Sequence, residues 1–296
     1  MEFKHLQTFQ TIIKTGSFSN AAEKLQYAQS TITLHIRQLE TELGVKVFAR
    51  RGKTIELTKA GEALSGHANF LLYRAEILQR EMIELAIGET GHLRIGAIEP
   101  VASLKLPNLL ASFCRKYPNI RLTLETGVTK VISERVATGK LDLAVCSPPD
   151  VSLGLSFRRL FNDSMALLIP DRHYLSNKAI VEVIDLEKER LLVTETNCPY
   201  RHVFETEVFA RGVNPDLGIE IMSLKVLQSM VQSGLGIGVM PVGVITPAPE
   251  NTTVRDLHEV DLNLPVGIAT FSEDRIPDLA FDVLRLALID GLKEKG

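Results

Sequence analysis

Apolar side chains in the first 43 residues recur every three or four positions, which is the spacing of one face of a helix. Three stripes of this kind are Leu6, Phe9 and Ile13; Ala21, Ala22 and Leu25; and Ile32, Ile36, Leu39 and Leu43. Asn20 followed by Glu23 fits a capping box at the start of the second stripe, with Ser19 as a competing N-cap. Only residues 26–28 separate the second and third stripes, so the pattern predicts a helix-turn-helix, with a helix over 4–15 completing its core.

The polar face of the third predicted helix is the first candidate site. Gln29, Ser30, Thr33 and Arg37 lie opposite the apolar stripe, and Thr31 and Leu34 border them. Amide, hydroxyl and guanidinium groups on one helix face are suited to base edges and phosphates in a DNA major groove. An ordinary solvated helix face is the alternative that this pattern alone leaves open.

A basic tip between two short apolar stretches predicts a wing behind these helices. Val45 and Val47 precede the tip, Ile55 and Leu57 follow it, and its cations are Arg50, Arg51 and Lys53. Residues 1–60 hold nine Lys and Arg against five Asp and Glu, a net charge of +4, whereas the whole chain carries −3. A basic N-terminal module on an otherwise acidic chain favours a phosphate backbone as its partner.

The order of these residues, LxxFxxIIxxGSFSxAAExLxxAQSTITxHIxxLExELGVxVFxRRGKxIxLTxAG, resembles the LysR-type bacterial transcription regulators. Later segments such as GHLRIGAIEP and VATGKLDLAV extend the resemblance over the whole chain. It implies a winged helix-turn-helix, a long linker helix, and a two-lobed α/β effector domain like a periplasmic binding protein. Promoter DNA and a small-molecule effector are the implied partners, RNA polymerase is a candidate partner, and the implied assembly is a homotetramer.

Two positions depart from the usual family pattern and put the operator sequence in doubt. Ala28 stands where the family commonly has Ser, which removes a side-chain cap worth about 0.5–2 kcal/mol of helix stability. Leu34 stands where Arg or Lys is frequent, which replaces a cation on the DNA face with an apolar contact for a thymine methyl.

A heptad stripe over residues 58–88 predicts one long helix. Leu64, Leu71, Leu78 and Leu85 recur every seven residues, and Ala68, Ala75 and Met82 fill the four-residue offsets. That spacing is typical of a coiled-coil seam, and the resembling family dimerises through this helix. A long amphipathic helix packed on its own domain is the alternative.

Beyond residues 88–91 the chain alternates strands and helices, which predicts a parallel sheet with helices on its faces. We expect strands over 92–98, 121–125 and 142–146, and helices over 103–117 and 128–138. The resulting organisation is a DNA-binding domain over 1–58, a linker helix over 59–90 and an effector domain over 91–296. The resemblance implies that the last consists of one lobe over 91–162 and 267–296 and another over 163–266, with crossings near 159–163 and 264–269.

Residues that follow the predicted strands or open a helix are candidate effector contacts, because ligands of open α/β sheets bind outside the carboxyl ends of the strands. These candidates are Glu99, Pro100, Val101, Ala102, Ser103, Thr126, Thr129, Cys146, Ser147, Cys198, Tyr200 and Arg201. Ser103 is expected to begin a helix, and helix starts of this kind bind anions through backbone N–H groups. Arg201 is the obvious cation for a small anionic effector, and an interlobe salt bridge is its equal alternative. Glu99, an unusual acid here, can pair with Arg201 or hold an amine.

Other chemistry has little support in the sequence. Three sparse cysteines suit a reducing compartment, although Cys146 and Cys198 could both face the binding site as thiol or soft-metal ligands. There is no GxSxG or HExxH motif, so we expect neither an enzyme nor a cofactor or metal. With no secretory segment, a cytoplasmic protein without a membrane partner is expected. The alternative function is a two-lobed small-molecule-binding protein or enzyme whose N-terminal module serves assembly only.

Overall fold

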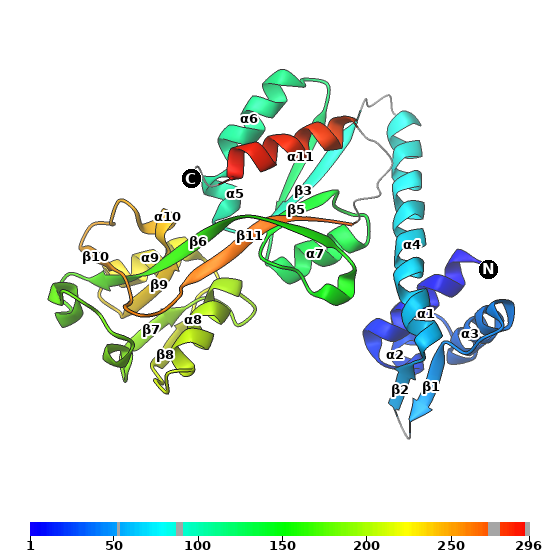
Figure 1. Cartoon of the computed structure of the whole chain (residues 1–296), viewed down its shortest axis with the longest axis horizontal. Helices are drawn as coiled ribbons and strands as arrows, with labels where there is room; N and C mark the ends of the chain where they lie inside the picture. The colour runs from blue at the N-terminus through cyan, green and yellow to red at the C-terminus, as the bar shows by residue number, and fades with distance from the viewer. Residues whose placement is uncertain (52–53, 87–90, 272–278, 294–296) are drawn as a thin grey trace. The chain divides into compact units, whose positions relative to one another are not determined.

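The computed structural model describes residues 1–51, 54–86, 91–271 and 279–293 (Figure 1). The chain divides into two compact units. The N-terminal unit is Met1–Glu89 with Ala137–Lys140, and the C-terminal unit is Thr90–Val136 with Leu141–Gly296.

The N-terminal unit begins with three helices and a two-stranded wing, as the apolar stripes predict. Its elements are α1 (Phe3–Thr15), α2 (Phe18–Leu25), α3 (Gln29–Leu43), β1 (Phe48–Arg51), β2 (Thr54–Leu57) and α4 (Lys59–Ala86). Phe9 and Ile32 are fully buried in the core that these helices share with Val47. The third stripe ends at Leu39, because Leu43 is exposed at the last turn of α3.

The start of α2 differs from the prediction. Ser17, rather than Ser19 or Asn20, is the N-cap: its Oγ accepts a hydrogen bond from the Asn20 backbone N–H at 3.0 Å. The predicted capping box at Asn20 and Glu23 is therefore wrong, since Asn20 already lies inside the first turn. The helix ends at Leu25, and Gln26 is its C-cap, with a left-handed φ of 56°.

The wing is an antiparallel hairpin in which Phe48 pairs with Leu57 and Arg51 with Thr54. Its first strand begins at Phe48 rather than at Val45, which is exposed ahead of the hairpin. The Glu40 carboxylate accepts a hydrogen bond from the Val47 N–H at 3.0 Å and so ties the approach to the wing to α3.

Helix α4 belongs to the core of the N-terminal unit over its first half. Ala68 is fully buried there, and Leu64, Leu71 and Leu72 pack against the same cluster. Farther along the helix Leu78 and Met82 are 57% and 51% exposed. The side chain of Leu85, the last member of the predicted seam, lies outside the described residues.

The C-terminal unit is built on one sheet of mixed direction. Its described strands are β3 (His92–Ala97), β4 (Arg121–Thr126), β5 (Leu143–Cys146), β6 (Ser156–Pro170), β7 (Arg190–Val193), β8 (Asp216–Glu220), β9 (Ile237–Pro241), β10 (Thr252–Arg255) and β11 (Asn263–Thr270). They run in the order β4-β3-β5-β11-β6-β9-β7-β8, with β10 paired to β6. Parallel pairing of β3 with β4 and β5, and of β7 with β8 and β9, gives two α/β halves.

Helices cover both faces of the two halves (Figure 1). They are α5 (Val101–Leu104), α6 (Leu106–Lys116), α7 (Thr129–Ala137), α8 (Pro199–Phe209), α9 (Leu224–Gln232), α10 (Val242–Ile245) and α11 (Leu279–Leu292). Three short 3-10 helices lie at Val151–Leu153, Tyr174–Asn177 and Val183–Leu186. Side chains of β6 alternate between two cores, as the period of a strand requires: Leu167 joins the α8 side, whereas Ala166 and Leu168 join the α9 side.

One predicted helix is divided in two. The single helix expected over 103–117 is wrong, because α5 ends at Leu104 and α6 begins at Leu106, with Lys105 between them. Ser103 accordingly lies within α5 and does not begin a helix. Pro107, in the first turn of α6, is the signal for this break, since a proline has no N–H to continue a helix from α5 but is tolerated in the first turn of a new one.

The long strand β6 and its antiparallel partner β11 join the two halves of the sheet. The register of this pair shifts between Val266 and Gly267. A Cβ atom at Gly267 would lie 2.1 Å from the Arg158 carbonyl oxygen, so only glycine fits at this bulge.

Candidate nucleic-acid interface and effector site

The predicted DNA-reading face of α3 is open to solvent. Gln29, Ser30, Thr33 and Arg37 are exposed, Thr31 is half-buried, and Leu34 is 52% exposed. Ile32, Ile36 and Leu39 hold the opposite face in the core. Ala28 is the N-cap and makes no side-chain hydrogen bond, so the first turn of α3 keeps backbone N–H groups available.

Two hydrogen bonds restrict what this face can offer. The Thr33 hydroxyl donates to the Gln29 carbonyl oxygen at 2.9 Å, and while it keeps that bond its Oγ1 is an acceptor toward a base or a water. The Ser19 hydroxyl of α2 donates to the Gln29 side-chain Oε1 at 3.2 Å. The amide of Gln29 is therefore held by the neighbouring helix before any DNA arrives.

The motif pattern did not select Tyr27, in the turn between α2 and α3. Its ring is exposed and meets the buried His35 ring edge-on, with the centroids 5.5 Å apart. The sequence signal that could have drawn attention to this position is a single aromatic side chain in a turn otherwise formed by polar and small residues. The described wing includes Arg50 and Arg51 in β1, but their side chains, and all of Lys53, lie outside the described residues.

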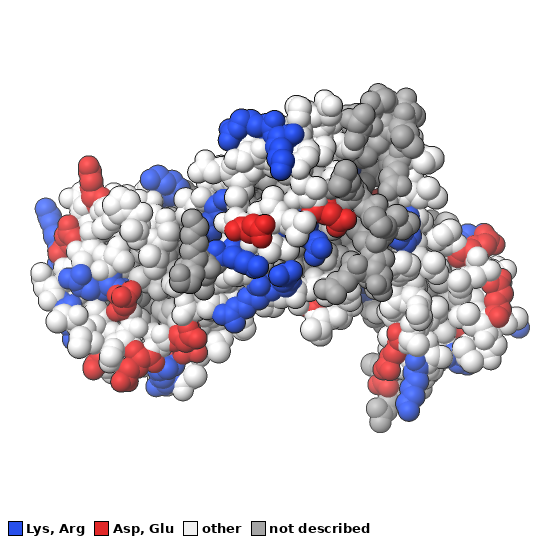
Figure 2. Space-filling model, turned by 45° about the horizontal axis from the view of Figure 1, so that its top comes forward, with Lys and Arg blue, Asp and Glu red and all other residues white. Residues whose placement is uncertain are grey.

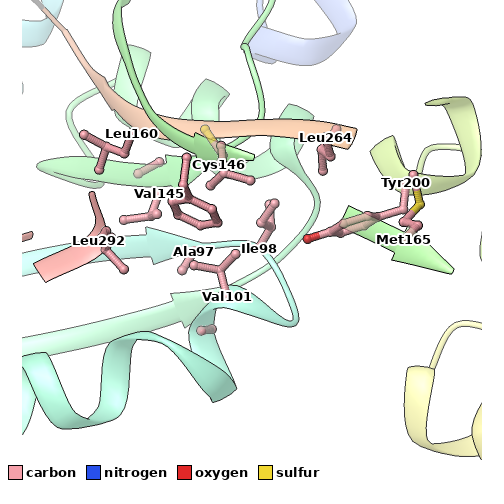
Figure 3. Packing of buried hydrophobic residues seen from close by; sticks show 14 of the residues in the cluster. Ala97, Ile98, Val101, Val145, Cys146, Leu160, Met165, Tyr200, Leu264 and Leu292 are labelled. Atoms are coloured by element: carbon pink, nitrogen blue, oxygen red, sulfur yellow. The ribbon is translucent and has the colours of Figure 1, made fainter. Parts of the chain in front are cut away.

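The first group of predicted effector contacts surrounds α5. The Ser103 hydroxyl donates to Glu99 Oε2 at 2.7 Å and also approaches the Pro100 carbonyl oxygen at 3.1 Å. Glu99 and Ser103 are exposed, whereas Pro100, Val101 and Ala102 are buried. Figure 3 shows the Val101 side chain among the buried apolar residues, so those three positions can offer a ligand only their backbone.

The second group lies at the start of α7 and in the loop after β5. Thr129 Oγ1 and Ser147 Oγ are 2.7 Å apart and hydrogen-bonded, with Ser147 buried and Thr129 half-buried. Thr126, at the end of β4, is exposed. The structure thus brings two of the predicted hydroxyl residues from different elements into direct contact.

The two cysteines do not share an environment. Cys146 is fully buried in the apolar cluster of Figure 3, and burial raises the pKa of its thiol to about 12. A thiol of this kind is a poor nucleophile and metal ligand. Cys198 is half-buried at the N-cap of α8. The expectation that both thiols face the binding site is wrong for Cys146.

A buried polar pair connects α8 to β6. The Tyr200 hydroxyl donates to Asp163 Oδ2 at 2.6 Å, and both residues are buried. Burial raises the pKa of Asp163, against the opposing effects of the Tyr200 hydrogen bond and the Lys105 charge. The Lys105 ammonium lies 4.6 Å from the centre of the Phe161 ring on the same strand as Asp163.

Arg201 is held within its own half of the sheet. Its Nε donates to Glu205 of α8 at 2.6 Å, and its guanidinium also bonds Glu220 of β8 at 2.9 Å and the Thr194 carbonyl oxygen at 2.8 Å. The pKa of Arg201 is shifted by opposing causes, burial lowering it and the two carboxylates raising it, with a raised pKa as the result. The alternative of an interlobe salt bridge, and the pairing of Glu99 with Arg201, are both wrong.

The remaining features bear on other classes of site. Figure 2 shows basic and acidic side chains in small neighbouring groups on the visible face, without a field of one sign. Within the described residues no three His, Cys, Asp or Glu side chains gather as a metal site would require. A search of the same residues finds no helix with the length and apolar character needed to cross a membrane.

Comparison with known proteins identifies both units. Residues 3–62 match the bacterial regulatory helix-turn-helix protein, lysR family, and residues 86–288 match the LysR substrate binding domain. The HTH-type transcriptional regulator YtlI of Bacillus subtilis (strain 168) is 33% identical over 270 residues, which cover 91% of this chain and 87% of that protein. GltR of the same organism is 32% identical over 255 residues, with coverages of 86% and 84%.

Solved structures agree with these matches. A variant of full-length OxyR from Pseudomonas aeruginosa aligns with a TM-score of 0.57 at 25% identity, covering 100% of this chain and 99% of that one. Full-length CbnR complexed with its target DNA shares the fold at a TM-score of 0.56 and 19% identity, with coverages of 99% and 100%. Both family models and the similar regulators agree with the winged helix-turn-helix and the two-lobed domain described above. The chain therefore belongs to the LysR family of bacterial transcriptional regulators.

Proposed function

We propose that this regulator reads its operator through the exposed side chains of α3 and controls that binding through an effector held between the two lobes of the C-terminal unit. The observation that carries the first part is the row of exposed polar residues opposite the buried stripe of α3. Thr33 and Arg37, one turn apart, present an acceptor and a cation on that row, while Leu34 offers a methyl-sized apolar contact.

Base reading and phosphate binding are assigned to different parts of the N-terminal unit. Gln29, Ser30 and Thr33 are placed near the N-terminal end of α3, which is the end of a recognition helix that meets base edges. Arg50, Arg51 and Lys53 of the wing are assigned to the phosphate backbone, which fixes position without reading sequence. CbnR, which shares the fold, has been solved in complex with its target DNA, and this supports duplex DNA as the partner.

The effector is proposed to bind near Ser103, Thr129 and the start of α8. An anionic effector would have to share Arg201 with Glu205 and Glu220. Glu220 is the more exposed of these two partners, at 47% against 21%, so its carboxylate is the one that an effector anion can replace. Pairing of α4 with a second copy completes the proposal, because the exposed Leu78 and Met82 continue the heptad stripe.

The decisive experiment compares Thr33→Ala with Thr41→Ala in operator binding. Thr41 is an exposed α3 threonine with the same kind of bond, from its hydroxyl to the Arg37 carbonyl oxygen at 2.7 Å, but it lies two turns farther from the helix start. Thr33→Ala is expected to relax the preference at one base pair by about 1–3 kcal/mol, and Thr41→Ala to leave it unchanged. Arg51→Ala is expected to weaken all sequences together and to reduce the salt slope by about one.

Two results would contradict this assignment. In the first, Thr33→Ala keeps the base preferences of the wild type and Arg51→Ala alters them. The wing, and not α3, would then read the bases. If the full chain retards promoter DNA no better than an acidic control protein does, the N-terminal unit serves assembly only and the alternative of a two-lobed binding protein holds.

A further inference from the structure

Ser19 and Gln29 form a contact between two helices that neither capping nor core packing explains. The Ser19 hydroxyl donates to Gln29 Oε1 at 3.2 Å, and both residues are exposed. Capping of α2 is already performed by Ser17, and Gln29 is the first residue of α3. The bond therefore joins a surface position of α2 to the leading side chain of the DNA-reading face.

The chemistry of a glutamine amide gives this bond a consequence. An unconstrained amide can turn over and present either its oxygen acceptor or its NH2 donors to a base edge. The serine hydroxyl can donate to Oε1, as it does here, or turn and accept from Nε2, so the bond fixes where the amide lies rather than which of its polar atoms faces outward. Within the described part of the chain, no protein acceptor takes the Nε2 hydrogens of Gln29.

We propose that Ser19 is a positioning residue for sequence recognition: its hydroxyl holds the Gln29 amide beside α2, so that the polar amide atom not bonded to Ser19 meets a base edge. With Oε1 on Ser19, as in the structure, Nε2 can donate to N7 or O6 of guanine, N7 of adenine or O4 of thymine, whereas cytosine offers only its N4 donor. This inference rests on the proposed assignment of the α3 face to DNA.

The test uses the full chain and the duplex that the wild-type protein selects from a randomised pool. Affinities for every single-base-pair variant of that duplex are measured for the wild type, Ser19→Ala, Ser19→Thr, Gln29→Ala and the Ser19→Ala/Gln29→Ala double variant. Gln29→Ala identifies the base pair that Gln29 reads, with an expected loss of preference of roughly tenfold. Ser19→Ala is expected to lose roughly two- to tenfold of preference at that same base pair, the worth of one hydrogen bond.

Three further readouts separate positioning from other roles of Ser19. Ser19→Thr keeps the hydroxyl and should restore the wild-type preference. In the Gln29→Ala background, Ser19→Ala should have no further effect on base preference. The thermal midpoint of Ser19→Ala should match that of the wild type, because an exposed serine that does not cap a helix contributes little to stability.

Each contrary result has a distinct meaning. If Gln29→Ala leaves every base preference intact, the proposed assignment of α3 itself fails. If Gln29→Ala shifts one base pair but Ser19→Ala shifts none, only the positioning role of Ser19 is overturned. If Ser19→Ala weakens all sequences equally and does so again without Gln29, Ser19 binds a phosphate and does not orient the amide.

Discussion

The imidazole rings of His5 and His35 lie with their centroids 5.1 Å apart inside the N-terminal unit, His5 on α1 and His35 on α3. They are only 2% and 6% exposed. His35 Nδ1 is 2.9 Å from the Thr8 hydroxyl, whereas neither ring nitrogen of His5 has a hydrogen-bond partner within the described residues. Lys4 and Glu2, which pair with each other, are the other charges that act on His35, and Tyr27 covers its ring.

This pair predicts that the N-terminal unit loses stability in mild acid. Burial, followed by the charges of His5 and Lys4, lowers the pKa of His35 below its ordinary value of 6.5. As the pH falls below about 6.5 the unfolded chain takes up a proton that the folded chain resists, so the free energy of unfolding falls until the folded pKa is passed. Thermal midpoints at pH 7.5 and 5.5 should differ more in the wild type than in His35→Gln.

His67→Gln is the matched control for that measurement, because His67 is exposed on α4. It should keep the acid sensitivity of the wild type. Equal pH dependence in the wild type and in His35→Gln would show that the buried pair does not cause it.

Charge placed on the far half of α4 should break the proposed dimer. Leu78→Asp and Met82→Asp together would bury two carboxylates without partners in a helix pair, which costs several kcal/mol. The full-length double variant should sediment as a smaller species than the wild type and bind its operator more weakly. Leu71 is unsuitable for this test because it packs against the core of the N-terminal unit. Gln79→Asp, at an exposed position between the two, is the control, and an unchanged sedimentation profile in the double variant excludes the seam.

The ion pairs of Arg201 predict opposite effects of two substitutions on effector binding. Glu220→Gln frees part of the guanidinium and should strengthen the binding of an anionic effector found by a thermal-shift screen of small organic acids. Arg201→Gln should abolish the effector's influence on operator binding. Arg190→Gln is the control, since Arg190 and Asp216 form a comparable but exposed pair at 3.6 Å. If the effector titrates all three variants identically, Arg201 does not contact the effector and has a structural role only.

Removing the Tyr200 hydroxyl should destabilise the C-terminal unit in a pH-dependent way. Tyr200→Phe leaves the buried Asp163 without its hydrogen-bond donor, at a cost of about 1–3 kcal/mol near neutral pH. Burial already raises the pKa of Asp163, so the folded chain takes up a proton more readily than the unfolded chain, and the loss should shrink as the pH falls. Urea denaturation at pH 7.5 and 5 measures both effects. Tyr174→Phe, which removes an exposed hydroxyl bonded to Glu189, should show neither; equal losses in the two variants would contradict the prediction.

The N-terminal unit was largely predictable because its information is local. Helical stripes and a basic hairpin tip indicate α1, α2, α3 and the wing without any distant contact. The N-cap of α2 was missed because Ser17, Ser19 and Asn20 can all cap a helix, and only the backbone geometry chooses among them.

The effector region was less predictable because its contacts join distant parts of the chain. Arg201 meets Glu220, 19 positions away, and Tyr200 meets Asp163, 37 positions away, on elements whose pairing no periodicity reveals. The rule that ligands bind at strand ends selected Thr129 and Ser147, which are in contact. The same rule could not predict that all four residues of β5, including Cys146, are buried.

Helix α4 contributes Ala68 to the same core as Phe9 and Ile32, with Leu72 packed against it. The proposed linker is therefore also the last structural helix of the DNA-binding unit. A chimera that exchanges effector domains between members of this family should be joined beyond Leu72, since a junction near residue 58 would combine one parent's helix with the other parent's core. The part of the chain that must be exchanged as one piece is therefore longer than the winged helix-turn-helix and includes the first half of α4.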